Sequence, residues 1–338
     1  MTGALLQFGL CALLIARAGW TLSHSADRLA AIHGWGRGWV GLALLGTVTS
    51  LPELASGISA VAVVGAPNLA VGNALGACVV NLGFLVVVDA LQRDQPMYRA
   101  AAATHVLSAA FGVVLLGLAA LAMLAGPSAP TVMNLGLASP LLLGGYLLAL
   151  RSVQAQGAAT DADADAAAGA ADDPERQREI RREWQRFAIA AAVVLAAGSA
   201  LPYAADRVAE AAGWSRSFVG TVFMAVATTL PEMAVTLGAL RLGALDLAIG
   251  NLLGSNLFNV TILAVDDLFH PGGPLLAAVA PVHVGTAVTA MTMAGGVLVG
   301  LVMRPQGRVL RVLSWVSVGL LAGVLVNALL LALAGDGG

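Results

Sequence analysis

Two glutamates with nearly identical surroundings are the residues of this sequence that point most directly to chemistry. Glu53 ends the segment Thr-Ser-Leu-Pro-Glu, and Glu232 ends the segment Thr-Thr-Leu-Pro-Glu 179 positions later. Both segments lie in long apolar stretches. A carboxylate inside a membrane-spanning helix costs several kcal/mol unless it is paired, solvated or bound to a cation. We therefore interpret the two glutamates as functional groups, with interhelical hydrogen bonding as the alternative role.

More oxygen atoms accompany each glutamate. The proline before it removes a backbone donor, which frees carbonyl groups one turn earlier in the helix. Two hydroxyl residues precede that proline, and two asparagines on the next expected helix lie within about 40° of one face. Carboxylate, hydroxyl, amide and carbonyl oxygens suit sodium, calcium or protons and not soft transition metals. The residues concerned are Thr49, Ser50, Asn73 and Asn81 in the first copy and Thr228, Thr229, Asn251 and Asn259 in the second.

The glutamates belong to an internal duplication of the chain. Residues of segment 26–53 recur in 205–232, and residues of segment 72–105 recur in 250–283 after a one-residue deletion. Counting about 20 apolar residues per spanning helix, we expect ten membrane spans. Five spans per copy is an odd number, so the second copy must enter the membrane with the opposite orientation. The expected spans are 3–22, 38–64, 68–91, 101–126, 131–150, 186–203, 217–240, 245–268, 275–302 and 309–334.

The predicted fold is therefore an all-α polytopic membrane protein with ten transmembrane helices as two inverted five-helix repeats. The chain is divided into a first repeat at 1–150, an acidic linker at 151–185 and a second repeat at 186–338. Such an arrangement is characteristic of secondary transporters, which bind their substrate at the repeat interface between interrupted helices. Two glutamates placed around a pseudo-two-fold axis would repel each other unless a cation or proton lies between them.

The composition agrees with a membrane protein, because 59% of the residues are hydrophobic and 11% are charged, against about 25% charged in soluble domains. No basic face suggests a nucleic-acid partner. The expected partners are the lipid bilayer and the transported cations, and a monomer is one open possibility. All seventeen basic residues are arginine and alanine is used heavily, which suggests a bacterial, inner-membrane protein. The arginines gather in the odd-numbered loops, which predicts both termini outside and the 154–185 stretch in the cytoplasm.

That stretch contains a partial calcium-loop pattern. Asp161, Asp163, Asp165 and Asp172 fall at positions 1, 3, 5 and 12 of the pattern. Ala166 stands where the loop needs glycine, so a solvated acidic linker is the favoured interpretation. Its arginine-rich end is expected to form a short charged helix that enters the sixth span.

The two motifs resemble the alpha repeats of the sodium/calcium exchanger family within the calcium/cation antiporters. The matching sequences are Thr-Ser-Leu-Pro-Glu with Gly-Asn-x-x-Gly, and Thr-Thr-Leu-Pro-Glu with Gly-Asn-x-x-Gly-Ser-Asn-x-x-Asn. The resemblance implies an antiporter that works by alternating access, without catalytic residues or a resident cofactor, and that carries calcium against sodium or protons. It implies that Glu53 and Glu232 are the central ligands. The remaining ligands implied are Thr49, Ser50, Asn81, Thr228, Thr229, Ser255 and Asn259, with backbone carbonyls near Gly46 and Ala225.

Two positions depart from the family pattern. Ala77 stands where the first repeat usually has serine, and Asn259 stands where the second often has aspartate. Sodium/calcium exchange is the favoured function, with calcium/proton or sodium/proton antiport as the nearest alternatives. An intramembrane enzyme using paired carboxylates would need an asymmetric acid and base, and a channel is disfavoured by Pro-broken helices in inverted repeats.

A second symmetric set of residues is Asp89 with His105 and Asp267 with His283, each pair sixteen positions apart. One interpretation is a hydrogen-bonded cap at the membrane surface. The other is a protonatable relay, because histidine changes charge near physiological pH. Asp266 adjoins only the second copy, and we expect it to be a surface carboxylate.

Overall fold

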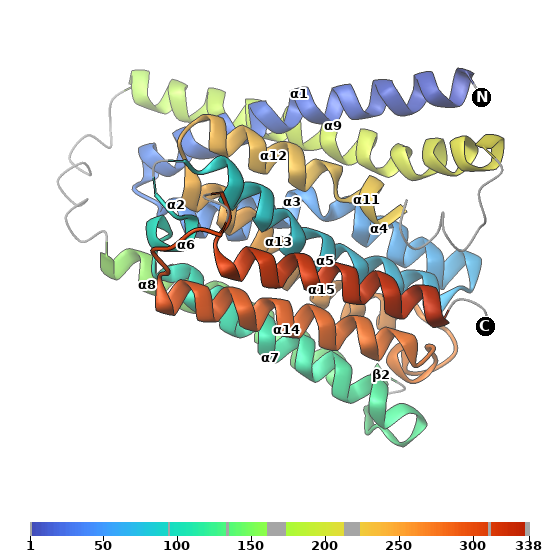
Figure 1. The fold of residues 1–338 in the computed structure, drawn as a ribbon. Helices are drawn as coiled ribbons and strands as arrows, with labels where there is room; N and C mark the ends of the chain where they lie inside the picture. The colour runs from blue at the N-terminus through green and yellow to red at the C-terminus, as the bar shows by residue number, and fades with distance from the viewer. Residues whose placement is uncertain are drawn as a thin grey trace.

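The computed structural model describes residues 2–93, 95–132, 135–160, 174–212, 224–309 and 312–334. Nearly all of these residues are helical, and the long helices run along one common direction (Figure 1). Within the described ranges the one sheet is a short pairing of β1 (Thr131–Val132) with β2 (Leu135–Gly136). The all-α class predicted from the sequence is therefore observed in the described part of the chain.

The helices of the first half are α1 (Thr2–His33), α2 (Arg37–Val40), η1 (Gly41–Leu45), α3 (Gly46–Thr49), α4 (Leu51–Ser59), η2 (Ala60–Val64), α5 (Pro67–Leu91), α6 (Met97–Ala100), α7 (Thr104–Ala125), η3 (Gly126–Ser128) and α8 (Ala138–Thr160). Those of the second half are α9 (Pro174–Ala212), α11 (Met224–Thr228), α12 (Leu230–Arg241), α13 (Leu245–Phe269), η6 (Leu275–Ala277), α14 (Val282–Met303) and α15 (Trp315–Ala334).

The duplication seen in the sequence is repeated in the element boundaries. Helix α5 and helix α13 have the same length and differ by 178 positions at both ends, and the same holds for α7 and α14. The turns before α5 and α13 also correspond, because Gly65 and Gly243 both adopt the left-handed conformation, with φ of 68° and 71°. Glycine is favoured there because a side chain strains this conformation.

Seven described helical stretches are long and apolar enough to cross a membrane, judged by length and composition: 5–33, 37–64, 67–91, 104–128, 245–269, 282–303 and 315–333. Their outward faces carry apolar stripes, for example Leu325, Leu329 and Leu333 at helical spacing on α15, which are 70%, 59% and 75% exposed. Apolar surface of this extent suits contact with lipid.

Several expected span boundaries are wrong. The first helix continues eleven residues past the expected end at 22, because its last turns pack against α9. The fifth helix begins at Ala138 and not at 131, because residues 131–132 pair with residues 135–136 as β1 and β2. Similarly, residues 275–277 form the separate turn η6 before α14 begins at Val282.

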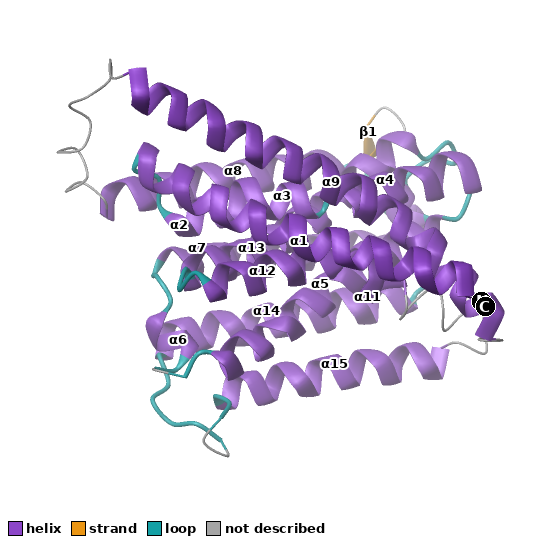
Figure 2. Cartoon of the chain, turned by 90° about the horizontal axis from the view of Figure 1, so that it is seen from above, coloured by secondary structure: helices purple, strands orange, loops and turns teal. Residues whose placement is uncertain are grey.

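Helices α1 and α9 lie side by side along one edge of the bundle (Figures 1 and 2). The arginine-rich end of the expected linker is continuous with α9, as predicted, since this helix runs unbroken from Pro174 to Ala212. The calcium-loop pattern at 161–172 lies outside the described residues. Helix α1 begins and α15 ends at one end of the bundle, whereas α8 ends and α9 begins at the other (Figure 1).

Helix α13 is the core of the molecule and is buried on nearly every side. Glycines let α13 pack directly against the backbone of η1 and α3. A Cβ atom on Gly46 would lie 2.7 Å from the Gly254 carbonyl carbon, and one on Gly254 would lie 2.3 Å from the Leu42 carbonyl oxygen. Glycine is required here because any side chain would push the two helices apart.

Candidate functional site

Both Leu-Pro-Glu segments interrupt their helices at equivalent residues. Ser50, between α3 and α4, has φ −90° and ψ 7°, and Thr229, between α11 and α12, has φ −82° and ψ 1°. Proline occupies the first turn of the helix that follows each break, where its missing N–H costs nothing. Each glutamate therefore lies in the first turn of a half-helix, where the N-terminal dipole favours a negative charge.

Glu232 is held by side chains from the other copy and from α13. Ser50 Oγ donates a hydrogen bond of 2.8 Å to Glu232 Oε1. Thr49 Oγ1 lies 3.2 Å from Ser255 Oγ, and Asn251 Nδ2 donates to the backbone carbonyl of Glu232 at 3.2 Å. All five residues are fully buried. The structure thus brings together Thr49, Ser50, Glu232 and Ser255 as the sequence predicts.

Glu53 has a different environment although it is equally buried. Neither of its carboxylate oxygens has a hydrogen-bond partner among the described residues. Thr228, the equivalent of Thr49, donates to Asn73 Oδ1 at 3.3 Å, and Asn73 Nδ2 donates to Ser56 Oγ at 3.0 Å. The position equivalent to Ser255 is Ala77, which has no hydroxyl group. The two copies therefore supply unequal numbers of donors to their glutamates.

Asn81 and Asn259 are both fully buried, and their amide atoms have no hydrogen-bond partners within the described ranges. Buried amides are rarely left unpaired, so these two are candidate ligands for a cation. Gly46 contributes its carbonyl oxygen, which accepts a hydrogen bond of 3.2 Å from Ser255 Oγ. Thr229 is buried, and its hydroxyl donates to Val226 O at 3.2 Å. Ala225 lies in α11, at a position whose side chain and burial are not among those described.

The centre holds two carboxylates. Glu53 and Glu232 lie close enough to repel each other when both are ionised. Among the described residues, no three His, Cys, Asp or Glu side chains gather at one point. The other potential ligands are hydroxyl, amide and carbonyl oxygens, which are the groups that hard cations prefer.

Asp89 and Asp267 bind the starts of helices from opposite halves of the chain. Asp89 Oδ2 accepts hydrogen bonds from Ser314 N and Ser317 Oγ, both at 2.7 Å. Asp267 Oδ2 accepts from Gly136 N at 3.0 Å and from Ser139 Oγ at 2.5 Å. Gly136 and Ser139 correspond to Ser314 and Ser317, 178 positions later, as Asp89 corresponds to Asp267. The aspartate of each half therefore caps the last helix of the other half, α15 or α8.

Of the two interpretations of the Asp/His set, the hydrogen-bonded cap agrees with the contacts of Asp89 and Asp267 and the relay does not, because no hydrogen bond joins these histidines to these aspartates in the described part of the chain. His105 Nε2 lies 3.0 Å from Asp246 Oδ1, and Asp89 and Asp267 serve as helix caps instead. The equivalent of Asp246 is Asn68, whose Oδ1 accepts a hydrogen bond from Ala280 N. Sequence reasoning missed Asp246, although the duplication that pairs it with position 68 could have identified it.

Asp266 is not a surface carboxylate, contrary to expectation. It is 0% exposed, and neither of its oxygens has a partner among the described residues. The physical reason is that helix α4 covers this face of α13.

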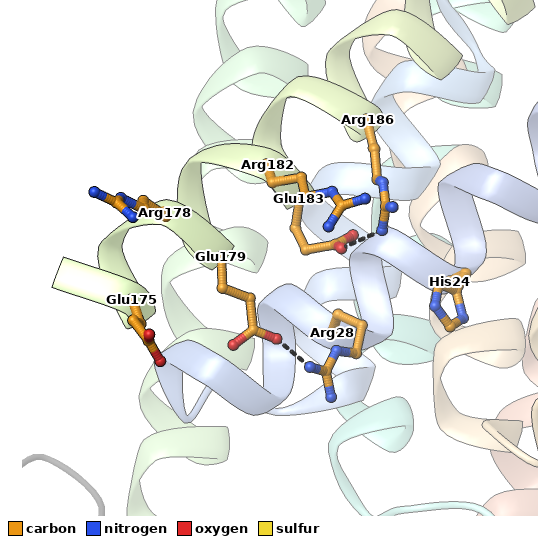
Figure 3. Close-up of a pocket in the computed structure, with 8 residues that line it drawn as sticks. All are labelled: His24, Arg28, Glu175, Arg178, Glu179, Arg182, Glu183 and Arg186. Carbon is orange, nitrogen blue, oxygen red and sulfur yellow. Dashed lines mark hydrogen bonds and ion pairs between the residues drawn. The ribbon is translucent and has the colours of Figure 1, made fainter. Parts of the chain in front are cut away.

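A cavity of about 690 Å³ lies away from the centre, between the end of α1 and the start of α9 (Figure 3). Two ion pairs lie in it: Arg28 contacts Glu179, and Glu183 binds Arg186 Nη1 at 2.6 Å. Glu183 also accepts a hydrogen bond of 3.0 Å from Ser25 Oγ. These contacts fasten α1 to α9 and are distant in sequence from the glutamate motifs.

A family model described as sodium/calcium exchanger protein matches residues 3–151 and 183–330. The chain belongs to the sodium/calcium exchanger protein family. This exchanger is accordingly a multi-pass membrane cation antiporter and not an enzyme.

Individual relatives agree with the family assignment. The exchanger is 30% identical to the putative antiporter CaxA of Alkalimonas amylolytica over 244 residues, which are 69% of this chain and 70% of the relative. It is 44% identical to the sodium/calcium exchanger MaX1 of Methanosarcina acetivorans over 64 residues, 19% of this chain and 18% of that protein.

The fold has counterparts among solved structures. A structure of the sodium-calcium exchanger NCX_Mj soaked with Na+ and Sr2+ superimposes with a TM-score of 0.74 at 19% identity, over 96% of this chain and 97% of the other. A second structure of NCX_Mj gives 0.72 at 20% identity, over 99% and 98% of the two chains. At this identity the likeness shows that the two proteins share a fold.

Proposed function

We propose that this exchanger carries calcium across the membrane against sodium by alternating access around Glu53 and Glu232. The observation that carries the proposal is the buried pair of carboxylates on two interrupted helices, surrounded by hydroxyl, amide and carbonyl oxygens. The ligands are Glu53, Glu232, Asn81, Asn259, Thr49, Ser50, Thr228, Thr229 and Ser255, with the carbonyls of Gly46 and Ala225. Calcium and sodium are substrates of this site, which needs no resident cofactor.

The transport mechanism rests on ten spans in two inverted five-helix repeats. Asp89 accepts a hydrogen bond from Ser317, and Asp267 accepts one from Ser139, the equivalent serine of the other half. This reciprocal pair of contacts supports a two-fold relation between the halves. The placement of both ends of the chain at one end of the bundle supports an even number of crossings (Figure 1). Alternating access is then a rocking of one part against the other around a fixed site. All the ligands come from one chain, so a monomer suffices.

The orientation follows from the arginines. Arg151 lies in the second half of α8, and Arg176 and Arg181 lie in the first turns of α9. Helix α8 ends and α9 begins at the same end of the bundle (Figure 1). The positive-inside rule places this end in the cytoplasm and both termini outside. The protein is then an inner-membrane protein whose outer surface includes the turns after η2 and α13.

The charge of the site limits the coupling ratio. Glu53 and Glu232 give −2 when both are ionised, and this matches one calcium ion or two sodium ions. A third sodium ion would leave a net positive charge in a low-dielectric centre, where uncompensated charge is costly. Exchange of two monovalent ions for one calcium ion is close to electroneutral.

Calcium/proton antiport is the second candidate, and Glu53 is the observation that favours it. Its oxygens receive no hydrogen bond from the described residues. A buried carboxylate without donors is stabilised by a proton as well as by a metal ion. The same pair of glutamates would then exchange two protons for one calcium ion.

Flux measurements separate the two candidates. The purified protein is reconstituted into liposomes, and uptake of labelled calcium is followed under an imposed sodium gradient and, separately, an imposed proton gradient. Sodium-driven uptake at constant pH on both sides supports the proposal. Uptake driven by protons alone would replace it with calcium/proton antiport, and uptake driven by neither would refute both.

A further inference from the structure

Asp266 occupies a pocket that exists because residue 57 is glycine. A Cβ atom on Gly57 would lie 2.4 Å from Asp266 Oδ2 and 2.8 Å from Oδ1. The carboxylate therefore packs directly against the backbone of α4. It is fully buried, and its two oxygens have no hydrogen-bond partner in the described part of the chain. Such a group is stable in an apolar interior when it carries a proton or a metal cation.

The pocket is present in one copy only. The shifts that relate the two copies pair Gly57 with Thr236 and Asp266 with Val88. Thr236 is buried, and its hydroxyl accepts a hydrogen bond of 3.0 Å from Asn251 Nδ2. Val88 is also fully buried. The glycine and the aspartate thus occur together in one copy, and the equivalent residues of the other copy provide neither a glycine nor a carboxylate.

The pocket lies between the central site and one end of the bundle. Asp266 follows Asn259 by seven residues, which places it on the same face of α13 about 10 Å further along. Gly57 follows Glu53 by one turn of α4, about 6 Å along that helix. The carboxylate is therefore displaced from the central glutamates toward the end at which η2 and α13 stop (Figure 1).

Within the described ranges, no ion pair involves this carboxylate. Of the arginines on helices packed against α13, Arg37 pairs with Asp27, and Arg151 and Arg241 are exposed. Asp267 is engaged with Gly136, Ser139 and Leu275, and Glu53 is itself acidic. The other acidic, imidazole and phenol groups on helices packed against α13 have separate partners. These are Asp89 with Ser317, His105 with Asp246, Tyr146 with Thr47 and Glu232 with Ser50.

We propose that Asp266 is a second cation site, which takes one monovalent cation, sodium or a proton, on the route between the central glutamates and the end of the bundle where α13 stops. The inference relies on the proposed function only for the idea that ions follow this route. Because the opposite route has Val88 at the equivalent place, ions reach the centre past a carboxylate from one side and past an apolar side chain from the other.

Cation occupancy can be measured directly on the purified full-length protein, without transport. The sodium arm counts bound ²²Na⁺ ions per protein at fixed pH in the absence of calcium. The proton arm follows the infrared band of protonated carboxyl groups during a pH titration. Asp266→Asn should lose one bound sodium ion in the first arm, or one titrating carboxyl band in the second. Equal sodium binding and equal bands in Asp266→Asn and the unmodified protein would overturn the proposal.

Two further variants guard against a folding artefact. Gly57→Ala keeps the carboxyl group but crowds it, so it should lose the same sodium ion as Asp266→Asn, whereas its carboxyl band should titrate at a different pH and not disappear. Alanine itself favours the helix. Ser23→Ala is the control, and both readouts should stay unchanged in it because this buried serine bonds to Gly19 and Val235 and carries no carboxyl group. Neither readout involves calcium flux, so a failure of sodium/calcium exchange would leave the assignment of Asp266 standing.

Discussion

Cys78 and Asn256 occupy equivalent positions in the two copies, and each hydrogen-bonds to the backbone of the other. Cys78 Sγ donates to the carbonyl of Asn256 at 3.7 Å, and Asn256 Nδ2 donates to the carbonyl of Cys78 at 3.3 Å. Reciprocal contact between equivalent residues is what a two-fold relation produces. The crossing of α5 and α13 is therefore the point about which the two halves are arranged, and the site lies beside it.

Ser50→Ala should weaken cation binding. Ser50 is the donor to Glu232 Oε1, and its loss leaves a buried charged acceptor unpaired. We expect the half-saturating calcium concentration to rise about tenfold, which corresponds to about 1.4 kcal/mol. Labelled calcium uptake over a range of concentrations measures this. Ser23→Ala is the matched control, because Ser23 is equally buried but bonds to Gly19 and Val235; a similar loss in both variants would argue against a role in the site.

Asn259→Asp should change the coupling ratio. The substitution adds a third carboxylate to a centre whose two ionised glutamates have a total charge of −2. A further monovalent cation can then be bound for each calcium ion. We expect calcium flux in the unmodified protein to be nearly independent of membrane potential, and flux in Asn259→Asp to depend on it. Proteoliposomes clamped at several potentials provide the measurement. A strong voltage dependence in the unmodified protein would contradict the electroneutral ratio.

Asp89→Asn and Asp267→Asn should lower stability more than transport affinity. Each carboxylate accepts several hydrogen bonds from the start of a helix in the other half, and hydrogen bonds to a charged group contribute about 1.5–3 kcal/mol each. Thermal unfolding in detergent should therefore begin at a lower temperature in both variants. Asp27→Asn serves as a control, because the exposed pair of Asp27 with Arg37 contributes about 1 kcal/mol or less. Unchanged melting in all three would mean that the caps contribute little.

The orientation can be tested with introduced thiols. The native Cys11 and Cys78 are buried, so background labelling should be low. Arg181→Cys on the exposed face of α9 should resist an impermeant thiol reagent added to intact cells, whereas Pro271→Cys in the turn after α13 should react. The reverse pattern would invert the topology.

The sequence was sufficient to predict the elements that occur in both copies of the duplication. The Leu-Pro-Glu motifs predicted both helix breaks, and hydrophobicity predicted the long apolar helices, because these features depend on residues near one another in the chain. Boundaries such as the start of α8 at Ala138 were missed, since they depend on a cap from Asp267, far away in sequence.

The contacts of Asp89, His105 and Asp266 were missed for the same reason. The symmetric spacing of Asp89 and His105 did not indicate their partners, which are Ser317 and Asp246 on other helices. The burial of Asp266 depends on Gly57, a small residue on another helix, and no local pattern around Asp266 indicates it.

The measurement that tests the central claim most directly is calcium uptake by Glu53→Gln and Glu232→Gln in liposomes with an imposed sodium gradient. Glutamine keeps the size of each side chain, and removal of a buried like charge should leave the fold intact, as the melting temperature will show. Calcium, however, loses half of its compensating charge. We predict uptake no faster than in empty liposomes for either variant, and near-normal uptake by either folded variant would contradict the account.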